Sequence, residues 1–185
     1  MNSLETRRQV IHMLLVLPAL YVLFFLGRGY FIGAAFLVIL LGLLIINLHC
    51  INKKIRIVEW LIRNFERSDI RFPGWGSACY ATGVLLAATF LNDMNSIAAT
   101  ILILGIGDGF STIVGSRGKV KLPYNKKKTL EGTIAFFVAS LSGYVFVGSA
   151  IIPVALIAAL VEGLDLPIDD NITVPIATII AFMVI

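Results

Sequence analysis

The stretch from Gly105 to Thr133 reads GIGDGFSTIVGSRGKVKLPYNKKKTLEGT and interrupts a chain that is otherwise mostly apolar. Asp108 lies between two glycines at the end of an apolar run, and six Lys or Arg residues and Glu131 follow it. An ionisable side chain at membrane depth costs free energy, and such residues are by default functional. The stretch therefore predicts a polar site at the edge of a membrane-embedded fold.

The composition identifies the class of fold. Of the 185 residues, 58% are hydrophobic and only 14% are charged, against about 25% charged in soluble proteins. We expect one all-α integral membrane domain over residues 1–185, a bundle of about seven transmembrane helices with its phosphate site at the cytoplasmic face. The expected spans are 10–26, 29–50, 77–91, 95–110, 132–148, 149–164 and 171–185. The fifth and sixth are either two helices or one re-entrant unit, because Gly148 and Pro153 interrupt them.

Positive charges predict the orientation of this multi-pass protein, because Lys and Arg of short loops stay in the cytoplasm. On this map fourteen of the 15 Lys and Arg residues fall on one side, and only Arg28 falls on the other. All acidic residues except Asp93 lie on or near that same side. We therefore expect a cytoplasmic N-terminus and a cytoplasmic active face. The loop that follows the second span alternates apolar and charged residues and predicts an amphipathic helix on the inner leaflet.

The central stretch has the chemistry of a phosphate site. Glycines beside Asp108 let the backbone bend and let phosphate oxygens approach main-chain amides. Asp108 is a hard oxygen donor suited to Mg²⁺. The six basic residues after it can neutralise a polyphosphate, and the amides of residues 131–133 would present a helix N-terminus to the same anion. For the lysines alone, simple membrane anchoring is the better explanation.

A late motif, VEGLDLPIDDNITVP at residues 161–175, supplies a second group of charges. It contains Glu162, Asp165, Asp169 and Asp170, more acids than a turn and a helix cap require. Close carboxylates repel one another unless a metal or basic groups compensate. The motif predicts a shared divalent-cation site opposite the basic loop, while its plain alternative is a turn with Asp170 or Asn171 capping the last helix.

The N-terminal segment ETRRQVIH is a possible accessory element. Glu5, Arg8 and His12 share one face if the first helix begins early. An interfacial anchor with an internal ion pair is the plain alternative.

Common nucleotide motifs do not account for the central stretch, because the glycine spacing of a P-loop is missing and Val120 stands where Ser or Thr is required.

These segments together resemble one known family. The run GDGFSTIVGSRGKVKLPYNKKKTLEGTIAFF, the later LVEGLDLPIDDNITVP and the opening ETRRQVIH are similar to the signature of dolichol kinases, phytol kinases and CTP-dependent diacylglycerol kinases. The resemblance implies a membrane kinase that transfers the γ-phosphate of CTP, with Mg²⁺ or another divalent cation, to the hydroxyl of a lipid alcohol. Gln9 departs from the pattern, because the family commonly has a second basic residue there.

The resemblance and the residue chemistry give one set of expected site residues. The expected metal ligands are Asp108, Glu131, Glu162, Asp169 and Asp170. All of these except Glu162 are also expected to be catalytic, and Asp169 and Asp170 would serve either as metal ligands or as the base. Lys121 and Lys128 are expected on the phosphates. The wider nucleotide set is Gly107, Gly109, Gly115, Arg117, Gly118, Lys119, Thr129, Gly132 and Asn171, with Arg8 and His12 as possible accessories.

Two other functions compete with the kinase. A CTP-dependent cytidylyltransferase that makes a CDP-activated lipid shares a K-T-x-E-G-like stretch, but it typically carries late basic residues, and this chain has none after Lys128. A small transporter predicts internal repeats and polar residues near the bilayer midplane, which the sequence lacks. The expected partners are a lipid alcohol, a nucleoside triphosphate and the bilayer, and no nucleic acid. The sequence does not decide between CTP and ATP as the donor, and it leaves the identity of the alcohol and the oligomeric state open.

Overall fold

The computed structural model describes residues 3–51, 56, 59–60 and 74–185, and these fold into helices with no strand among them. A single isolated β-bridge joins Lys121 to Thr129. The α-helices are α1 (Ser3–Tyr21), α2 (Arg28–Cys50), α4 (Trp75–Phe90), α5 (Met94–Leu102), α6 (Asp108–Gly115), α7 (Leu130–Ser140), α8 (Tyr144–Val147), α9 (Ile151–Gly163) and α10 (Asp170–Val184). Short π-helical or 3₁₀ segments continue several of them: η1 (Val22–Leu26), η2 (Ile103–Gly107), η3 (Leu141–Gly143) and η4 (Gly148–Ala150).

Within the described residues, four helical stretches are long and apolar enough to cross a membrane by length and composition: Thr6–Leu26, Arg28–Leu48, Met94–Gly115 and Leu130–Gly163. They support the expected all-helical membrane class. The helices α4 and α10, with 16 and 15 residues, are shorter than a typical span of about 20 residues. The count of about seven crossings therefore stays a prediction, as does the amphipathic helix after α2, most of which lies outside the described residues.

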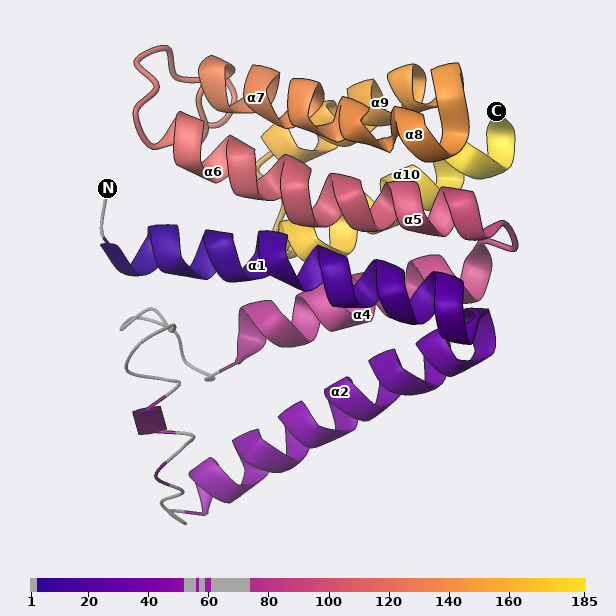
Figure 1. Ribbon diagram of the computed structural model, residues 1–185. Coiled ribbons are helices and arrows are strands. Elements are labelled where there is room, and N and C mark those ends of the chain that lie inside the picture. Colours follow the sequence, from indigo (N-terminus) through magenta and orange to yellow (C-terminus); the bar gives the residue numbers. More distant parts are fainter. Residues whose placement is uncertain (1–2, 52–55, 57–58, 61–73) are drawn as a thin grey trace.

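The segment Leu130–Gly163 is a helical hairpin. Its 34 residues run out along α7 and α8, turn at Gly148 and return along α9, which packs beside α7 (Figure 1). Gly148 has a φ of 57°, a backbone conformation that favours glycine. The residues expected for the fifth and sixth spans thus form two helical arms joined by one sharp turn.

The fourth predicted span, 95–110, was too short, because α5, η2 and α6 form one continuous rod from Met94 to Gly115. Its glycines do not end the helix; they let neighbouring helices approach. A Cβ at Gly105 would lie 2.2 Å from Cγ2 of Val16 on α1, and one at Gly107 would lie 2.5 Å from Oγ of Ser140 on α7. Asp108 follows the π-helical turn η2 directly and begins α6, between these close approaches to α1 and α7.

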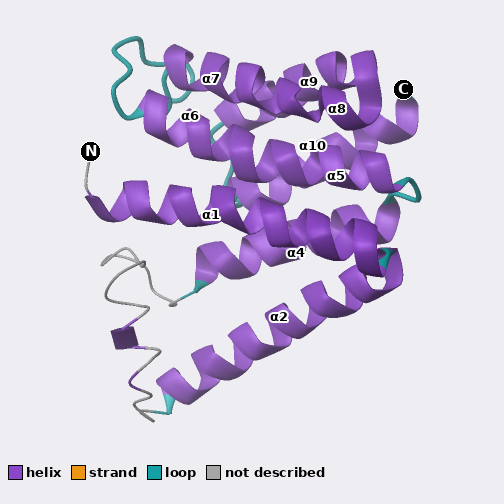
Figure 2. Cartoon of the chain, in the orientation of Figure 1, coloured by secondary structure: helices purple, strands orange, loops and turns teal. Residues whose placement is uncertain are grey.

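The start of α1, with Arg7 and Arg8, and the basic loop between α6 and α7 lie at one end of the bundle, which we call the polar end (Figures 1 and 2). The end of α2 and the start of α4 lie at the same end. Arg28 lies at the opposite end, where its guanidinium donates to the carbonyls of Ala88 and Thr89 and to Oδ1 of Asn92. Arg28, the basic residue predicted on the other side of the membrane, thus satisfies backbone carbonyls in the last turn of α4. The cytoplasmic orientation of the polar end stays a prediction.

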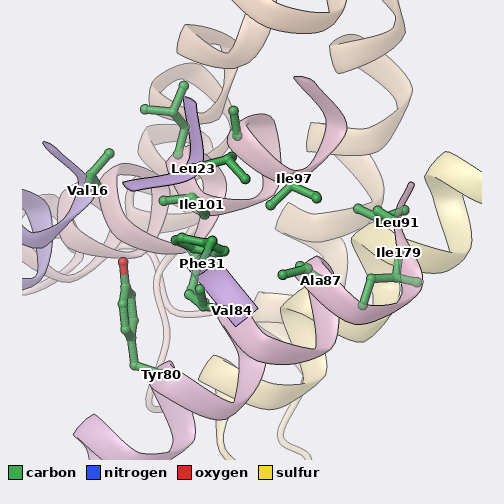
Figure 3. Close-up of a cluster of buried hydrophobic side chains, with 14 residues drawn as sticks. Val16, Leu23, Phe31, Tyr80, Val84, Ala87, Leu91, Ile97, Ile101 and Ile179 are labelled. Carbon is green, nitrogen blue, oxygen red and sulfur yellow. The ribbon is translucent and has the colours of Figure 1, made fainter. Parts of the chain in front are cut away.

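Two apolar clusters hold the helices together. One joins α1, α2, α4 and α5 around residues such as Leu23, Phe31 and Ile101 (Figure 3), and the second joins α5, α7, α9 and α10 around Phe136. The helices α4 and α10 cross closely at Gly83, where a Cβ would lie 2.1 Å from the carbonyl oxygen of Asn171. This crossing fixes the start of α10 at the polar end.

We predict that Gly83→Ala destabilises the protein by about 1–3 kcal/mol or more, because the methyl group meets backbone that cannot move aside. Gly76→Ala in the same helix is the matched control, since a Cβ there meets nothing within 4 Å. Unfolding curves of the purified variants in detergent measure the difference. Equal stability of the two variants would show that α4 and α10 do not cross as closely as described.

Candidate functional site

An ion-pair cluster at the polar end joins three segments that are distant in sequence. The ammonium of Lys128, in the loop before α7, lies 2.7 Å from Oδ2 of Asp170 at the start of α10. It also pairs with Oε1 of Glu162, near the end of α9. Lys128 is partly buried and Glu162 is fully buried. The central and late motifs of the sequence therefore meet in space.

The loop between α6 and α7 is folded so that Lys128 points inward. The amide of Leu122 donates to the carbonyl of Lys128 at 3.2 Å. The side chain of Asn125 is buried, donates to the carbonyl of Gly163 at 3.0 Å and thereby fastens the loop to α9. The neighbouring Lys127 faces solvent and pairs with Asp165 at 3.0 Å. Two adjacent lysines thus occupy different environments.

Glu162 is a buried carboxylate with one oxygen satisfied and one without a partner. Its Oε1 accepts a 2.8 Å hydrogen bond from Oγ of Ser111 and also pairs with Lys128. Its Oε2 is buried and has no hydrogen-bond partner within the described part of the chain. An unsatisfied buried oxygen costs about 1–3 kcal/mol, so this atom is suited to a ligand that supplies the missing bond.

Asp108 is the first residue of α6 and is partly buried beside this cluster. Its carboxylate forms no hydrogen bond or ion pair with the residues that the structure describes. The charges that act on it come from Lys128, Glu162, Asp170 and Arg8. Asp108 is therefore held among charged groups while its oxygens stay available to a ligand.

Lys128 keeps its positive charge in this setting. Burial by itself would lower the pKa of Lys128, but the nearby carboxylates of Glu162, Asp170 and Asp108 raise the pKa above the ordinary value for lysine. A permanently protonated ammonium surrounded by three acids suits an anionic phosphate group that arrives with its own counter-ion.

Asp169, not Asp170 or Asn171, caps the last helix, so the expected cap was wrong by one residue. Oδ1 of Asp169 accepts from the amide of Asn171 at 3.0 Å and from its side-chain amide at 2.9 Å. The cap turns Asp170 the other way, toward Lys128. Of the two adjacent acids, one therefore shapes the helix end and the other belongs to the ion-pair cluster.

Glu131 is not brought together with Asp108. Its Oε1 accepts hydrogen bonds from the amides of Lys119 at 2.8 Å and Val120 at 3.2 Å, which closes the basic loop on itself. Its charge is also not among those that act on Asp108. The shared metal site expected for these two acids stays a prediction that this placement does not support.

Thr129 caps α7 and accepts hydrogen bonds from two backbone amides, those of Gly132 and Thr133, that were expected to bind phosphate. Oγ1 of Thr129 accepts from the amide of Gly132 at 3.2 Å, and the amide of Thr133 donates to the carbonyl of Thr129 at 3.0 Å. Gly132 also packs against α6, where its Cβ would lie 3.0 Å from Cα of Gly115. These residues set the distance between α6 and α7.

The remaining expected residues lie on α6 and on the loop that follows it. Gly118 packs on Thr129, where a Cβ would lie 2.5 Å from Oγ1, and Gly109 packs on Met13 of α1. The side chains of Arg117, Lys119 and Lys121 are exposed on the loop. Their role in phosphate binding stays a prediction.

The first helix begins early, at Ser3, which is the condition for Glu5, Arg8 and His12 to share one helix face. Gln9, the departure from the family pattern, is buried, and its Nε2 donates to Oγ1 of Thr112 on α6 at 3.2 Å. The ring of His12 contacts the ring of Tyr80 on α4 edge to face, with centroids 4.9 Å apart. This helix therefore packs against the site with Arg8 and His12 on its near side.

Sequence reasoning missed Ser111 and Tyr80. Ser111 lies three residues after Asp108, and that spacing places the two side chains on neighbouring positions of one helix face. Tyr80 carries no local sequence signal, since only the crossing of α4 with the rod of α5 and α6 brings it near Asp108.

A magnesium ion fits this donor set only in a limited way. No three His, Cys, Asp or Glu side chains within the described residues form a ready metal cluster. Mg²⁺ usually binds one or two carboxylates together with substrate phosphates and waters, so it does not need such a cluster. The unpartnered oxygen of buried Glu162 is the atom of the described chain best suited to this kind of site.

Comparisons with known proteins support the family resemblance. The chain is 36% identical over 184 residues to an uncharacterised protein of Methanocaldococcus jannaschii, covering 97% of this chain and 92% of the relative. It is 34% identical over 148 residues to a probable chloroplastic phytol kinase of Triticum aestivum, covering 68% of this chain and 49% of that protein. It is 32% identical over 170 residues to the chloroplastic farnesol kinase of Arabidopsis thaliana, covering 80% and 55%.

No family model and no solved structure matches the chain. The chain spans about half the length of the two plant kinases. The plant relatives are nevertheless named as kinases of the family that the motifs at residues 107–137 and 160–175 resemble. The chain belongs to the polyprenol-kinase-like family of membrane proteins that includes the plant phytol and farnesol kinases.

Proposed function

We propose that this protein is a membrane kinase that transfers the γ-phosphate of a nucleoside triphosphate, CTP by resemblance, to the hydroxyl of a lipid alcohol. The observation that carries the proposal is the cluster at the polar end. There a protonated lysine pairs with two acids from separate helices, and close to them lies Asp108, which has no hydrogen-bond or ion-pair partner among the described residues. Phosphoryl transfer needs mainly positioning and neutralisation of charge, and this cluster supplies both.

In the proposed reaction the alcohol oxygen attacks the γ-phosphorus and a new O–P bond forms. The bond between the γ-phosphorus and the β,γ-bridging oxygen breaks, and the nucleoside diphosphate leaves with that oxygen. The alcohol proton passes to Asp108, whose carboxylate has no other partner among the described residues. Lys128 offsets the negative charge of the phosphate oxygens.

A divalent cation, when bound, would neutralise charge on the triphosphate, and Glu162 and Asp170 are the residues that would hold it. Both acids are paired with Lys128 in this structure. Within the protein, Lys128 therefore compensates the same carboxylates that a cation would use. We propose that, once a cation occupies these carboxylates, the ammonium of Lys128 turns toward the phosphates.

The lipid acceptor reaches this site from the bilayer. The outer faces of α1 and α2 are apolar and exposed over most of their length, as expected of helices that face lipid. The ion-pair cluster lies at one end of the bundle, near the depth of a lipid head group. A long tail can stay between lipid and helices while its hydroxyl approaches Asp108.

We predict that the purified protein moves label from γ-³²P-labelled CTP to farnesol or phytol in the presence of Mg²⁺. ATP, diacylglycerol and dolichol offered in parallel define donor and acceptor preference. Phosphatidate offered with CTP tests the cytidylyltransferase. Release of pyrophosphate with a CDP-lipid product, and no labelled lipid phosphate, would overturn the kinase assignment.

We predict that Asp108→Asn abolishes turnover and leaves membrane insertion and thermal stability nearly unchanged, because this carboxylate makes no described contact that the amide would lose. Label transfer and a thermal unfolding curve measure the two properties. The matched control is Asp165→Asn at the same end of the bundle, which should keep near wild-type turnover. Unchanged turnover in Asp108→Asn would remove Asp108 from the reaction.

We predict that Lys128→Gln raises the KM for nucleotide by about tenfold or more, since a hydrogen bond to a charged group contributes about 1.5–3 kcal/mol. Glutamine keeps a hydrogen-bond donor for Glu162, so the fold is preserved better than with alanine. Lys127→Gln, at the adjacent exposed lysine, should change the KM little. Equal small effects would assign the basic loop to membrane anchoring alone.

A further inference from the structure

The side chain of Tyr80 is a buried polar group that the proposed reaction has not yet used. Tyr80 is 8% exposed, and its hydroxyl has no hydrogen-bond partner within the described part of the chain. Burying a hydroxyl without a partner costs about 1–3 kcal/mol, so buried tyrosines usually find one. A vacant hydroxyl of this kind indicates that a ligand supplies the partner.

The hydroxyl lies against the helical rod that carries Asp108. A Cβ at Gly105, three residues before Asp108, would be 3.3 Å from Oη of Tyr80. The charge of Asp108 acts on the same hydroxyl. Tyr80 thus reaches from α4 to the rod of α5, η2 and α6 at Gly105, close enough for the charge of Asp108 to act on its hydroxyl.

The ring of Tyr80 belongs to an apolar cluster, and its oxygen lies at the edge of that cluster. Figure 3 shows the side chain standing on α4 with its oxygen on the side of Val16, while the other labelled members of the cluster are apolar. The His12 ring contacts the Tyr80 ring from α1. An apolar region therefore ends in one hydroxyl that is within electrostatic range of the Asp108 carboxylate.

We propose that Tyr80 positions the acceptor, by donating a hydrogen bond from its hydroxyl to the oxygen of the incoming lipid alcohol. The alcohol would lie between Tyr80 and Asp108, with its proton directed to the carboxylate and one lone pair free for attack. The junction of the apolar cluster with these polar groups suits an alcohol on a long hydrocarbon chain. The inference rests on the proposed function, because it assigns a residue to the acceptor side of that reaction.

The test is Tyr80→Phe, which removes the hydroxyl and keeps the ring. We expect the KM for farnesol to rise about tenfold, the loss expected for one hydrogen bond to a ligand, while the KM for nucleotide stays unchanged. The unfolding temperature should stay equal or rise, because the variant no longer buries an unsatisfied hydroxyl. Tyr30→Phe, at an exposed tyrosine of α2, is the matched control.

An unchanged KM for farnesol would overturn the inference. So would a fall in unfolding temperature together with equal losses for both substrates, which would give Tyr80 a structural role only. Both results leave the kinase assignment intact, since wild-type turnover is measured in the same assay.

A binding experiment separates this inference from the proposed function. Farnesol should raise the unfolding temperature of the wild-type protein in lipid nanodiscs more than the corresponding hydrocarbon without a hydroxyl, and Tyr80→Phe should abolish the difference. If no alcohol is phosphorylated but this difference is seen, the acceptor site stands and the proposed reaction fails. If wild type shows no hydroxyl-dependent shift, or the variant keeps it, Tyr80 does not bind the acceptor.

Discussion

The pairing of Lys128 with Glu162 and Asp170 is the interaction on which the polar end of this protein depends. Glu162 is fully buried near the end of an apolar helix, a position in which an uncompensated carboxylate would be strongly destabilising. Lys128 and Ser111 satisfy one of its oxygens. The same contacts fasten the basic loop to α9 and α10, so one ammonium determines how three distant segments meet.

This arrangement also explains why the site is suited to phosphate chemistry. Lys128 compensates the buried Glu162 and the partly buried Asp170. A triphosphate with its cation can take over both halves of this ion pair, so that no buried charge is left alone when the lysine turns toward the phosphates. Asp108 lies beside the pair on a helix whose glycines allow α1 and α7 to pack closely. Tight packing around the Asp108 carboxylate restricts where a lipid hydroxyl can approach, and we propose that this restriction orients the acceptor.

Much of the site could be predicted from sequence, since the Gly-Asp-Gly stretch, the lysine run and the late acids stand out against an apolar background. Their roles were harder to predict because they depend on contacts between helices. Charge type does not reveal that Glu131 bonds to its own loop or that Asp169 is the cap. The glycines predicted a bend, but they allow close crossings of a helix that continues to Gly115. Tyr80 could not be found from sequence, because its significance comes from its place opposite Gly105.

A double-mutant cycle on Lys128 and Glu162 tests the central interaction most directly. The free energies of unfolding of the wild type, Lys128→Met, Glu162→Gln and the double variant would be measured by reversible unfolding in mixed micelles. We predict a coupling energy of about 1–3 kcal/mol, with the double variant more stable than Lys128→Met, because that single change leaves Glu162 charged and buried without its cation. Additive effects, with no coupling, would contradict the account.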